Sequence, residues 1–526
     1  MTSGLKRIFS FSIRFFLYFA SYTGFSLLPN LALFTAGCFR FTHPVLRTVQ
    51  SALIILAAVI IFYHDSYLPG WGQLTVSLHE NQSPLAVILD SCLEMISKSL
   101  LILLIFIVIT VFFISDLIHL YTLIVAVFIF IAAEHLSPYI SEKTVHDYTL
   151  NNTDSAPQSM DLPPQIGEAT NENAEKYYQT FLAAEGLRQV QMPYELPKNF
   201  ESFDILMINI CSLSTSDIEA SGLTTHEVFS KFDFIFDNFN SVSSYSTPAT
   251  LRLLLSNCGQ RTETEIYSNV RPECQLIGSI ERLGYQIHII FDHNGIYGKY
   301  HQTLQELAGL PEKMYPPEKF SKRYISFDGT PIYADSAVFS AYLNLSDQQP
   351  GQIFAFMNLI SLHDGNRLLG ENHSMPYPPR LRTLLDDLNK LMDLLKKRNR
   401  NTLLIVIPEH GAAIKGDKMQ ISKLREIPTD SITKIPVMVK FFGLNSELKL
   451  RHIKEQHSYL SVAELIKRSI ENNVFSENDA TENPMDICTE LPQQAFISES
   501  TNACFMNFKG RDLFKLKGEE WTEYKK

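Results

Sequence analysis

The second half of the chain contains apolar runs that each end at or near a residue whose side chain can bind a metal or transfer a proton. The runs lack strict alternation of apolar and polar positions, which is typical of strands buried on both faces of a sheet. An amphipathic helix is predicted at 379–399, between two of these runs. The pattern therefore indicates strand–helix–strand crossovers and a central, mostly parallel sheet in an α/β domain. The runs are FDILMINIC (203–211), YQIHIIFDHNG (285–295), IFAFMNLISLHDG (353–365) and TLLIVIPEHG (402–411).

The first 135 residues show a different pattern, which predicts an N-terminal multi-span α-helical membrane domain. Apolar stretches of about the length needed to cross a bilayer follow one another in this region. Four to six spans are compatible with the pattern, because the first two stretches are short enough to form a tight hairpin. The stretches lie at about 10–26, 28–42, 47–63, 97–114 and 117–134.

The placement of charges favours five spans. Basic residues lie around the start of the first stretch and between the second and third stretches, whereas the loop at 64–95 has no Lys or Arg. By the positive-inside rule the N-terminus is cytoplasmic, and an odd number of spans places everything after residue 134 outside the cytoplasm. The basic residues are Lys6, Arg7, Arg14, Arg40 and Arg47.

The rest of the chain divides into a linker and one large domain. Residues 136–200 are polar and contain several prolines, which predicts a linker over the membrane with one helix near 173–187. Residues 201–526 are long enough for a single α/β domain with a full core. The tail at 504–524 predicts a terminal hairpin at a sheet edge, with turns at its two glycines.

Three residues that follow predicted strands suggest a metal site. In open α/β sheets, ligands bind at the carboxyl ends of the strands. Cys211, Glu409 and His410 lie there and offer a thiol, a carboxylate and an imidazole, the ligands that zinc prefers. Taken singly, Cys211 is better explained as a buried core cysteine, and His293 and His363 as hydrogen-bonded loop histidines. Taken together, the residues predict a zinc ion bound by Cys211, Glu409 and His410.

The segment SYSTP supports two interpretations equally well. A hydroxyl residue followed by Pro248 is an ordinary start for an amphipathic helix. Alternatively, Ser246 is a nucleophile at a helix N-terminus, where free backbone N–H groups favour an incoming phosphate. The predicted zinc site favours the second interpretation, because the Ser246 hydroxyl would complete or approach the fourth metal position and metal coordination activates a hydroxyl. His363 and His293 would then carry protons or bind phosphate oxygens.

The chain has seven cysteines, four of which flank polar loops in the second half. Cys258 with Cys274, and Cys488 with Cys504, are compatible with two local disulfides in an oxidising compartment or with free buried thiols. If both disulfides form, Cys211 has no obvious partner. An unpaired thiol outside the cytoplasm needs protection, which a bound metal would provide.

Several longer segments closely resemble the cellulose phosphoethanolamine transferases of bacterial cellulose-secretion systems, the BcsG family. The likeness covers residues 201–526, and the predicted membrane part agrees in arrangement. The segments are NICSLS, FNSVSSYSTPATLRLL, SNCGQ, HNGIYG, LHDGNR, PEHGAAIKGDKMQISKLREIP and SITKIPVMVKFFG.

The resemblance implies a fold of the alkaline phosphatase and sulfatase type and a zinc-dependent reaction. Phosphoethanolamine would pass from phosphatidylethanolamine to hydroxyls of exported cellulose through a covalent phosphoethanolamine-serine intermediate. The protein would be a multi-pass inner-membrane protein with a periplasmic catalytic domain, in contact with the lipid bilayer and with other subunits of the cellulose synthase complex.

The resemblance also assigns roles to individual residues. Ser246 corresponds to the nucleophile, and Cys258 and Cys274 correspond to the family's disulfide. The chain departs from the family pattern at Thr247, where Gly is expected, and at Thr215, where Trp is expected, and both changes concern contacts with the acceptor. The implied zinc ligands are Cys211, Glu409 and His410 with Ser246, and the other implied active-site residues are His363, Arg425 and Tyr245.

Two other functions are compatible with parts of the pattern. The first has the same fold but a different acceptor or reaction: a transferase acting on another envelope glycan or lipid, or a hydrolase of the phosphatase or sulfatase type. The thiol among the metal ligands argues against it. The other is a non-catalytic membrane scaffold of the secretion complex, against which the full set of predicted catalytic residues argues. A net charge of −11 without a basic patch argues against a nucleic-acid partner.

Overall fold

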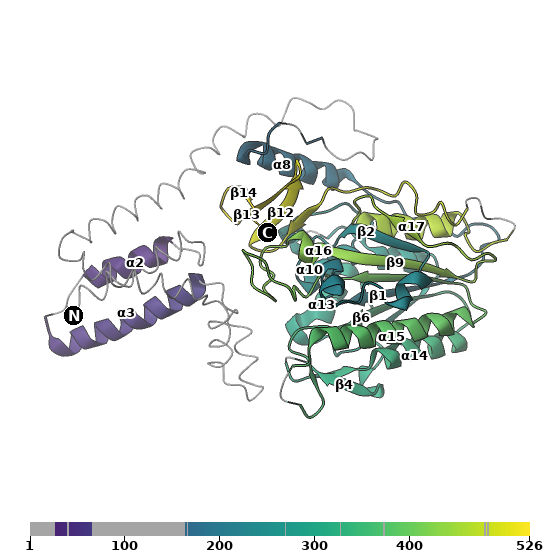
Figure 1. The fold of residues 1–526 in the computed structure, drawn as a ribbon, viewed down its shortest axis with the longest axis horizontal. Coiled ribbons are helices and arrows are strands. Elements are labelled where there is room, and N and C mark those ends of the chain that lie inside the picture. The colour runs from purple at the N-terminus through teal and green to yellow at the C-terminus, as the bar shows by residue number, and fades with distance from the viewer. Residues whose placement is uncertain are drawn as a thin grey trace. The chain divides into compact units, whose positions relative to one another are not determined.

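The protein divides into two compact units, Met1–Pro157 and Gln158–Lys526. The computed structural model describes residues 27–38, 42–65, 164–165, 167–268, 270–326, 328–371, 374–477, 480 and 483–525 (Figure 1).

The described part of the first unit consists of two helices, α2 (Leu27–Cys38) and α3 (Pro44–Asp65). The window Pro44–Ile61 in α3 is long and apolar enough to cross a membrane, and it is the one such helix among the described residues. Most of its large apolar side chains are exposed, as they would be against lipid. Of the five predicted spans, the first, fourth and fifth lie outside the described residues.

The second unit is built around a seven-stranded sheet with the order β10-β2-β9-β8-β1-β6-β3. The four strands predicted from apolar runs, β1, β3, β6 and β8, are neighbours and run parallel. In chain order the seven strands are β1 (Asp204–Ile210), β2 (Phe234–Asn240), β3 (Gln286–Phe291), β6 (Ile353–Leu359), β8 (Thr402–Pro408), β9 (Lys434–Phe442) and β10 (Arg451–Ile453).

The sheet is mixed rather than uniformly parallel, because β9 runs against both of its neighbours, β8 and β2. The chain leaves β8 and reaches β9 through a loop and the short helix α16 (Asp430–Thr433), without a long crossover helix. A strand that starts at the edge where its predecessor ends must run back in the opposite direction.

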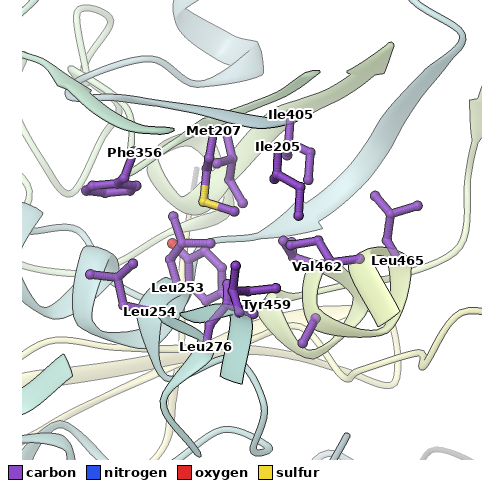
Figure 2. Close-up of a cluster of buried hydrophobic side chains, with 14 of the residues drawn as sticks. Ile205, Met207, Leu253, Leu254, Leu276, Phe356, Ile405, Tyr459, Val462 and Leu465 are labelled. Carbon is purple, nitrogen blue, oxygen red and sulfur yellow. The ribbon is translucent and has the colours of Figure 1, made fainter. Parts of the chain in front are cut away.

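Helices cover both faces of the sheet. Along β1, Ile205 and Met207 point into one apolar cluster, and Leu206 and Ile208 point into the other, as the period of a strand requires. Figure 2 shows the first cluster, in which strand side chains meet α10 and α17. This face is covered by α10 (Ser246–Leu254), α12 (Leu276–Arg282), α13 (Tyr300–Ala308) and α17 (Tyr459–Glu471), and the opposite face by α9 (Thr215–Ala220), α14 (Asp335–Gln348) and α15 (Tyr377–Lys396).

The helix predicted at 379–399 is α15, and the apolar residues that recur along it with helical spacing are all buried: Leu381, Leu384, Leu385, Leu388, Leu391, Met392 and Leu395. Figure 1 shows α14 and α15 on the side of the sheet opposite α17. The remaining short elements are α11 (Glu263–Ser268), the 3₁₀ turns at Glu227–Lys231, Pro272–Cys274, Tyr297–Lys299 and Pro317–Lys319, and a small sheet of β4 (Lys322–Ile325), β5 (Pro331–Tyr333) and β7 (Arg367–Leu368).

The C-terminal tail forms its own antiparallel sheet, with the order β11-β12-β13-β14. The predicted hairpin and its glycine turns are confirmed, and the hairpin strands form one edge of this small sheet. The tail packs against the helix predicted near 173–187, which is α8 (Asn171–Leu187). The tail strands are β11 (Ile497–Glu499), β12 (Ala503–Phe508), β13 (Arg511–Leu516) and β14 (Thr522–Glu523).

Cys258 and Cys274 form a disulfide, whereas Cys488 and Cys504 are free thiols. The expectation of a second disulfide is therefore wrong. Cys488 is buried in the cluster under the central sheet, while Cys504 lies on β12 against the α8 cluster. The two thiols belong to different cores, so the sequence pattern around them could not pair them.

Candidate active site

Three predicted ligands meet at the carboxyl edge of the central sheet. One ligand atom from each of Cys211, Glu409 and His410 lies within 4.8 Å of the other two, and all three residues are buried. The backbone fixes their positions, because the hydrogen bonds between β1 and β8 continue into the two segments that follow these strands. Glu409 N–H donates to Ile210 O at 2.8 Å, and Leu213 N–H donates to His410 O at 2.6 Å.

Ser246 reaches this cluster from the first turn of α10. Its Oγ lies 3.3 Å from Cys211 Sγ and 3.2 Å from His410 Nε2. The N-cap residue, Tyr245, makes no side-chain capping hydrogen bond. The helix therefore presents amide groups and the positive end of its dipole beside the serine hydroxyl, as an incoming anion requires.

The two carboxylate oxygens of Glu409 have different surroundings. Oε1 accepts hydrogen bonds from Asn358 Nδ2 at 2.6 Å, Tyr300 OH at 3.1 Å and Thr250 Oγ1 at 3.1 Å. Oε2 is buried and has no hydrogen-bond partner among the described residues. A buried carboxylate oxygen without a donor is costly, and a cation held together with a thiol and an imidazole would satisfy it.

Burial keeps both the Cys211 thiol and the His410 imidazole in their neutral forms. Burial, reinforced by the negative charge of Glu409, raises the pKa of Cys211. Burial and the nearby Arg425 lower the pKa of His410 well below its usual value, so the imidazole is neutral, the form that binds metals. A divalent cation would reverse the preference of Cys211 and favour its thiolate.

His410 Nδ1 faces two groups of opposite character. It lies 2.8 Å from the carbonyl oxygen of Gly411, which accepts, and 2.9 Å from Arg425 Nη1, which donates. With the ring proton on Nδ1 and donated to Gly411 O, Nε2 would keep its lone pair for a metal. A backbone carbonyl that holds the other ring nitrogen is the usual support of a ligating histidine.

Arg425 and Tyr245 form one wall of the site. Arg425 Nη1 lies 3.3 Å from His410 Nε2, and its guanidinium group lies over the Tyr245 ring, 5.7 Å from the centroid. Tyr245 OH donates to Glu426 Oε1 at 2.7 Å. The guanidinium group thus places a positive charge beside the serine hydroxyl.

The two other predicted histidines occupy different positions. His363 is half-buried, and its Nδ1 lies 2.8 Å from Asp364 O. Burial and the charge of Arg425 lower its pKa to about 4, so its ring is neutral at pH 7. His293 is not brought to the serine: its Nε2 lies 2.8 Å from Asn358 Oδ1, and its Nδ1 accepts from Gly295 N–H.

Sequence reasoning missed the polar side chains around Glu409. Asn209 and Asn358 interrupt the apolar runs of β1 and β6 and lie opposite each other in register. Thr250 follows Ser246 by one helical turn on α10. A polar residue inside a doubly buried strand needs a buried partner, and this signal could have pointed to both asparagines.

Comparisons with known proteins cover nearly the whole chain. Residues 158–521 match the family described as cellulose biosynthesis protein BcsG, C-terminal domain, and residues 8–133 match the family described as its N-terminal domain. The cellulose biosynthesis protein BcsG of Salmonella typhimurium is 32% identical over 534 residues, which cover 98% of this chain and 95% of that protein.

Solved structures resemble the second unit at low sequence identity. A protein of the alkaline phosphatase superfamily from Vibrio parahaemolyticus is 11% identical with a TM-score of 0.46, covering 66% of this chain and 87% of that one. The periplasmic domain of the phosphoethanolamine transferase EptC from Campylobacter jejuni is 12% identical with a TM-score of 0.37, covering 55% and 95%.

Proposed function

Because the chain belongs to the BcsG family of cellulose biosynthesis proteins, we propose that it transfers phosphoethanolamine from phosphatidylethanolamine to hydroxyls of exported cellulose. One observation carries this proposal: Ser246 Oγ lies within 3.3 Å of both Cys211 Sγ and His410 Nε2, at an uncapped helix N-terminus. A serine hydroxyl among metal ligands and free amides is suited to attack a phosphorus atom.

Cys211, Glu409 and His410 would hold a zinc ion, and a bound zinc ion would supply positive charge that lowers the pKa of a neighbouring hydroxyl. The donor set supports this assignment, since Glu409 Oε2 is buried without a partner in the described part of the chain. Thiolate, carboxylate and imidazole ligands on three fixed backbone positions leave room for one more oxygen, and Ser246 Oγ is the nearest candidate.

The reaction would proceed in two displacements at Ser246. In the first, Ser246 Oγ forms a bond to the donor phosphorus, and the bond from phosphorus to the diacylglycerol oxygen breaks. The neutral His363 takes the serine proton and returns it to the leaving oxygen. In the second, the oxygen of a cellulose hydroxyl forms a bond to phosphorus, the bond from phosphorus to Ser246 Oγ breaks, and the hydroxyl proton passes through His363 to Ser246 Oγ. The α10 amides and Arg425 stabilise the negative charge that develops on the phosphoryl oxygens.

The first unit would bring this site to its lipid donor. We assign residues 1–135 to the membrane domain with about five spans and the rest of the chain to the periplasm. Of the linker predicted at 136–200, the part from residue 158 belongs to the same compact unit as 201–526, because α8 packs against the C-terminal tail. The N-terminus would be cytoplasmic, and the spans would contact other subunits of the cellulose synthase complex. An inner-membrane anchor gives a periplasmic site access to both phosphatidylethanolamine and the emerging polymer.

Intact-mass analysis of the full chain in detergent, incubated with phosphatidylethanolamine, tests the proposal. We expect the mass to increase by one phosphoethanolamine group on Ser246, and chelation of zinc to abolish this adduct. Ser246→Ala should lose both the adduct and transfer to cello-oligosaccharides while keeping its zinc. Transfer activity retained by Ser246→Ala would contradict the covalent scheme, and transfer to other envelope glycans in preference to cello-oligosaccharides would contradict the assigned acceptor.

A further inference from the structure

A line of buried polar side chains leads from His293 to Glu409. We propose that His293 is a positioning residue that acts through Asn358 to hold Glu409 in the orientation that binds metal. The inference rests on the proposed metal site. It gives a function to a histidine that does not contact Ser246 and to an asparagine inside an apolar strand.

The hydrogen bonds of His293 determine its tautomer. Gly295 N–H donates to His293 Nδ1 at 3.0 Å, so this nitrogen carries a lone pair. The single proton of the neutral ring is then on Nε2 and is donated to Asn358 Oδ1 at 2.8 Å. The ring also stacks on Phe291, with the centroids 5.0 Å apart. Burial lowers the pKa of His293 to about 4, which keeps the ring neutral.

His293 thereby fixes which way the Asn358 amide faces. With Oδ1 accepting from His293, the amide nitrogen points to the other side, where its two protons go to Asn209 Oδ1 at 2.9 Å and to Glu409 Oε1 at 2.6 Å. A flipped amide would place its carbonyl oxygen against the Glu409 carboxylate. The histidine proton makes that arrangement unfavourable, because Nε2–H would then face an NH₂ group.

The amide in turn fixes the carboxylate. Asn358, Tyr300 and Thr250 surround Glu409 Oε1, whereas Oε2 lacks a hydrogen-bond partner among the described residues. Oε2 is the oxygen that lies 3.9 Å from His410 Nε2. One oxygen saturated by donors and one left bare is the arrangement that a carboxylate needs to bind a metal through a single oxygen.

Removing the His293 donor should therefore weaken metal binding at a distance. In His293→Leu, we expect the zinc affinity of the full chain to fall by about 10- to 100-fold, the usual effect of losing such a supporting contact. His293→Gln keeps a side-chain N–H donor and should recover part of the affinity. Asn358→Leu should weaken binding at least as much, and adding His293→Leu to Asn358→Leu should cause no further loss, because the histidine acts through the asparagine.

His457 provides the matched control. It is also a buried histidine of the second unit, and its Nδ1 lies 3.0 Å from Ser461 Oγ and 3.2 Å from Pro492 O. Its hydrogen bonds and ring contacts in the described part of the chain involve neither Asn358 nor Glu409. His457→Leu should lower the melting temperature of the metal-free chain as His293→Leu does, and it should leave zinc affinity unchanged.

The measurement is competition for zinc between the full chain in detergent and a chromophoric chelator at fixed pH, with melting temperatures of the metal-free proteins recorded beside it. Weaker binding by His293→Leu, with recovery in His293→Gln and none of this change in His457→Leu, supports the inference. Unchanged affinity in His293→Leu, an equal loss in His457→Leu, or additive losses in the double variant would overturn it. If the wild-type chain itself binds no zinc, the metal site of the proposed function fails instead.

Discussion

Glu409 is tolerated in the core because the residues around it supply hydrogen bonds to one of its oxygens. Its side chain is fully buried, and a buried charge is costly unless it is paired or hydrogen-bonded. Asn209 and Asn358 lie opposite each other on neighbouring strands, and Asn358 donates to Glu409. The same arrangement stabilises the carboxylate and leaves one oxygen for a cation, so stability and proposed chemistry depend on the same contacts.

Asp335 should make the stability of the protein depend on pH. Burial raises the pKa of Asp335 to about 7, with Arg323 opposing the shift, and burial next to Asp335 raises the pKa of Asp292. The folded state therefore keeps a proton that the unfolded chain releases near pH 4. The contribution of Asp335 to the free energy of unfolding is therefore fully present below pH 4. This contribution is lost as the pH rises through about 7.

Asp335→Asn, which is always neutral, should remove part of that loss. Between pH 5 and pH 8 we expect its decrease in unfolding free energy to be smaller than that of the wild type, by on the order of 1–3 kcal/mol. Thermal unfolding of the full chain in detergent at the two pH values measures it. Asp347→Asn, at the exposed end of the same helix, should behave as the wild type. Identical pH dependence in Asp335→Asn and the wild type would reject the assignment.

Gly411 follows Glu409 and His410, the two proposed ligands after β8, and has no room for a side chain. A Cβ atom there would lie 2.6 Å from Ser214 Oγ and 2.9 Å from Asp217 Oδ2. Neither neighbour can move easily, since Asp217 Oδ2 accepts hydrogen bonds from Ser214 Oγ at 2.8 Å and Ala412 N–H at 2.7 Å. Gly411→Ala should cost about 1–3 kcal/mol of stability by overpacking and displace His410, lowering zinc affinity about tenfold or more.

Zinc titration and thermal unfolding of Gly411→Ala would measure both effects. The control is Gly186→Ala, in helix α8, where a Cβ atom would meet nothing within 4 Å. That change should leave zinc affinity unaltered and should not destabilise the chain, because Ala favours a helix over Gly by about 1 kcal/mol. Zinc binding by Gly411→Ala that matches the wild type would show that the loop after His410 adapts freely.

At the scale of elements, the disulfide joins the loop that follows α10 to the 3₁₀ turn Pro272–Cys274 that precedes α12. It links Cys258 to Cys274, 16 residues apart, and both cysteines are buried. Closing a loop of this length restricts the unfolded chain by about 3 kcal/mol. We expect Cys258→Ser with Cys274→Ser to lose about that much unfolding free energy, and a reducing agent to lower the melting temperature of the wild type but not of the double variant.

Cys488→Ser serves as the control for that prediction, because it removes a buried thiol without removing a cross-link. It should be destabilised by the burial of a hydroxyl, yet its melting temperature should still respond to the reducing agent. If reduction leaves the wild-type melting temperature unchanged, the disulfide does not stabilise the fold.

The elements whose pattern is local were predictable from the sequence. The doubly buried strands β1, β3, β6 and β8 are near-continuous apolar runs, and α15 repeats its apolar residues with helical period. The direction of β9 was not predictable from its own residues, since a buried strand has the same composition in either direction. The packing of the tail sheet on α8 was not predictable either, because the two lie more than 300 residues apart in the sequence.

The candidate site follows the same division. Residues that end apolar runs, such as Cys211 and Glu409, could be placed together because parallel strands share one edge. The pattern around Ser246 is equally compatible with an ordinary helix start and with a nucleophile, and the structure places its Oγ 3.3 Å from Cys211 Sγ and 3.2 Å from His410 Nε2. The position of His293 depends on how the Asn358 amide is oriented, which no sequence pattern carries.

At the scale of the whole molecule, the two units divide the proposed reaction between membrane and periplasm. Helix α3 exposes Leu53, Ile55 and Val59, which suits lipid rather than water. The second unit has its own core and a disulfide, and disulfides persist in oxidising compartments. Both features agree with an anchored protein whose catalytic unit faces the periplasm.

Fusions to reporter proteins would test this orientation. Five spans with a cytoplasmic N-terminus place residue 43 inside, the loop at 64–95 outside and the C-terminus outside. Alkaline phosphatase, which requires oxidation, should be active when fused after Gln82 or Lys526 and inactive after His43. Green fluorescent protein should give the reverse result. A fluorescent fusion after Lys526 would mean an even number of spans, and it would place Ser246 on the side of the membrane away from exported cellulose, so the proposed acceptor could not be reached.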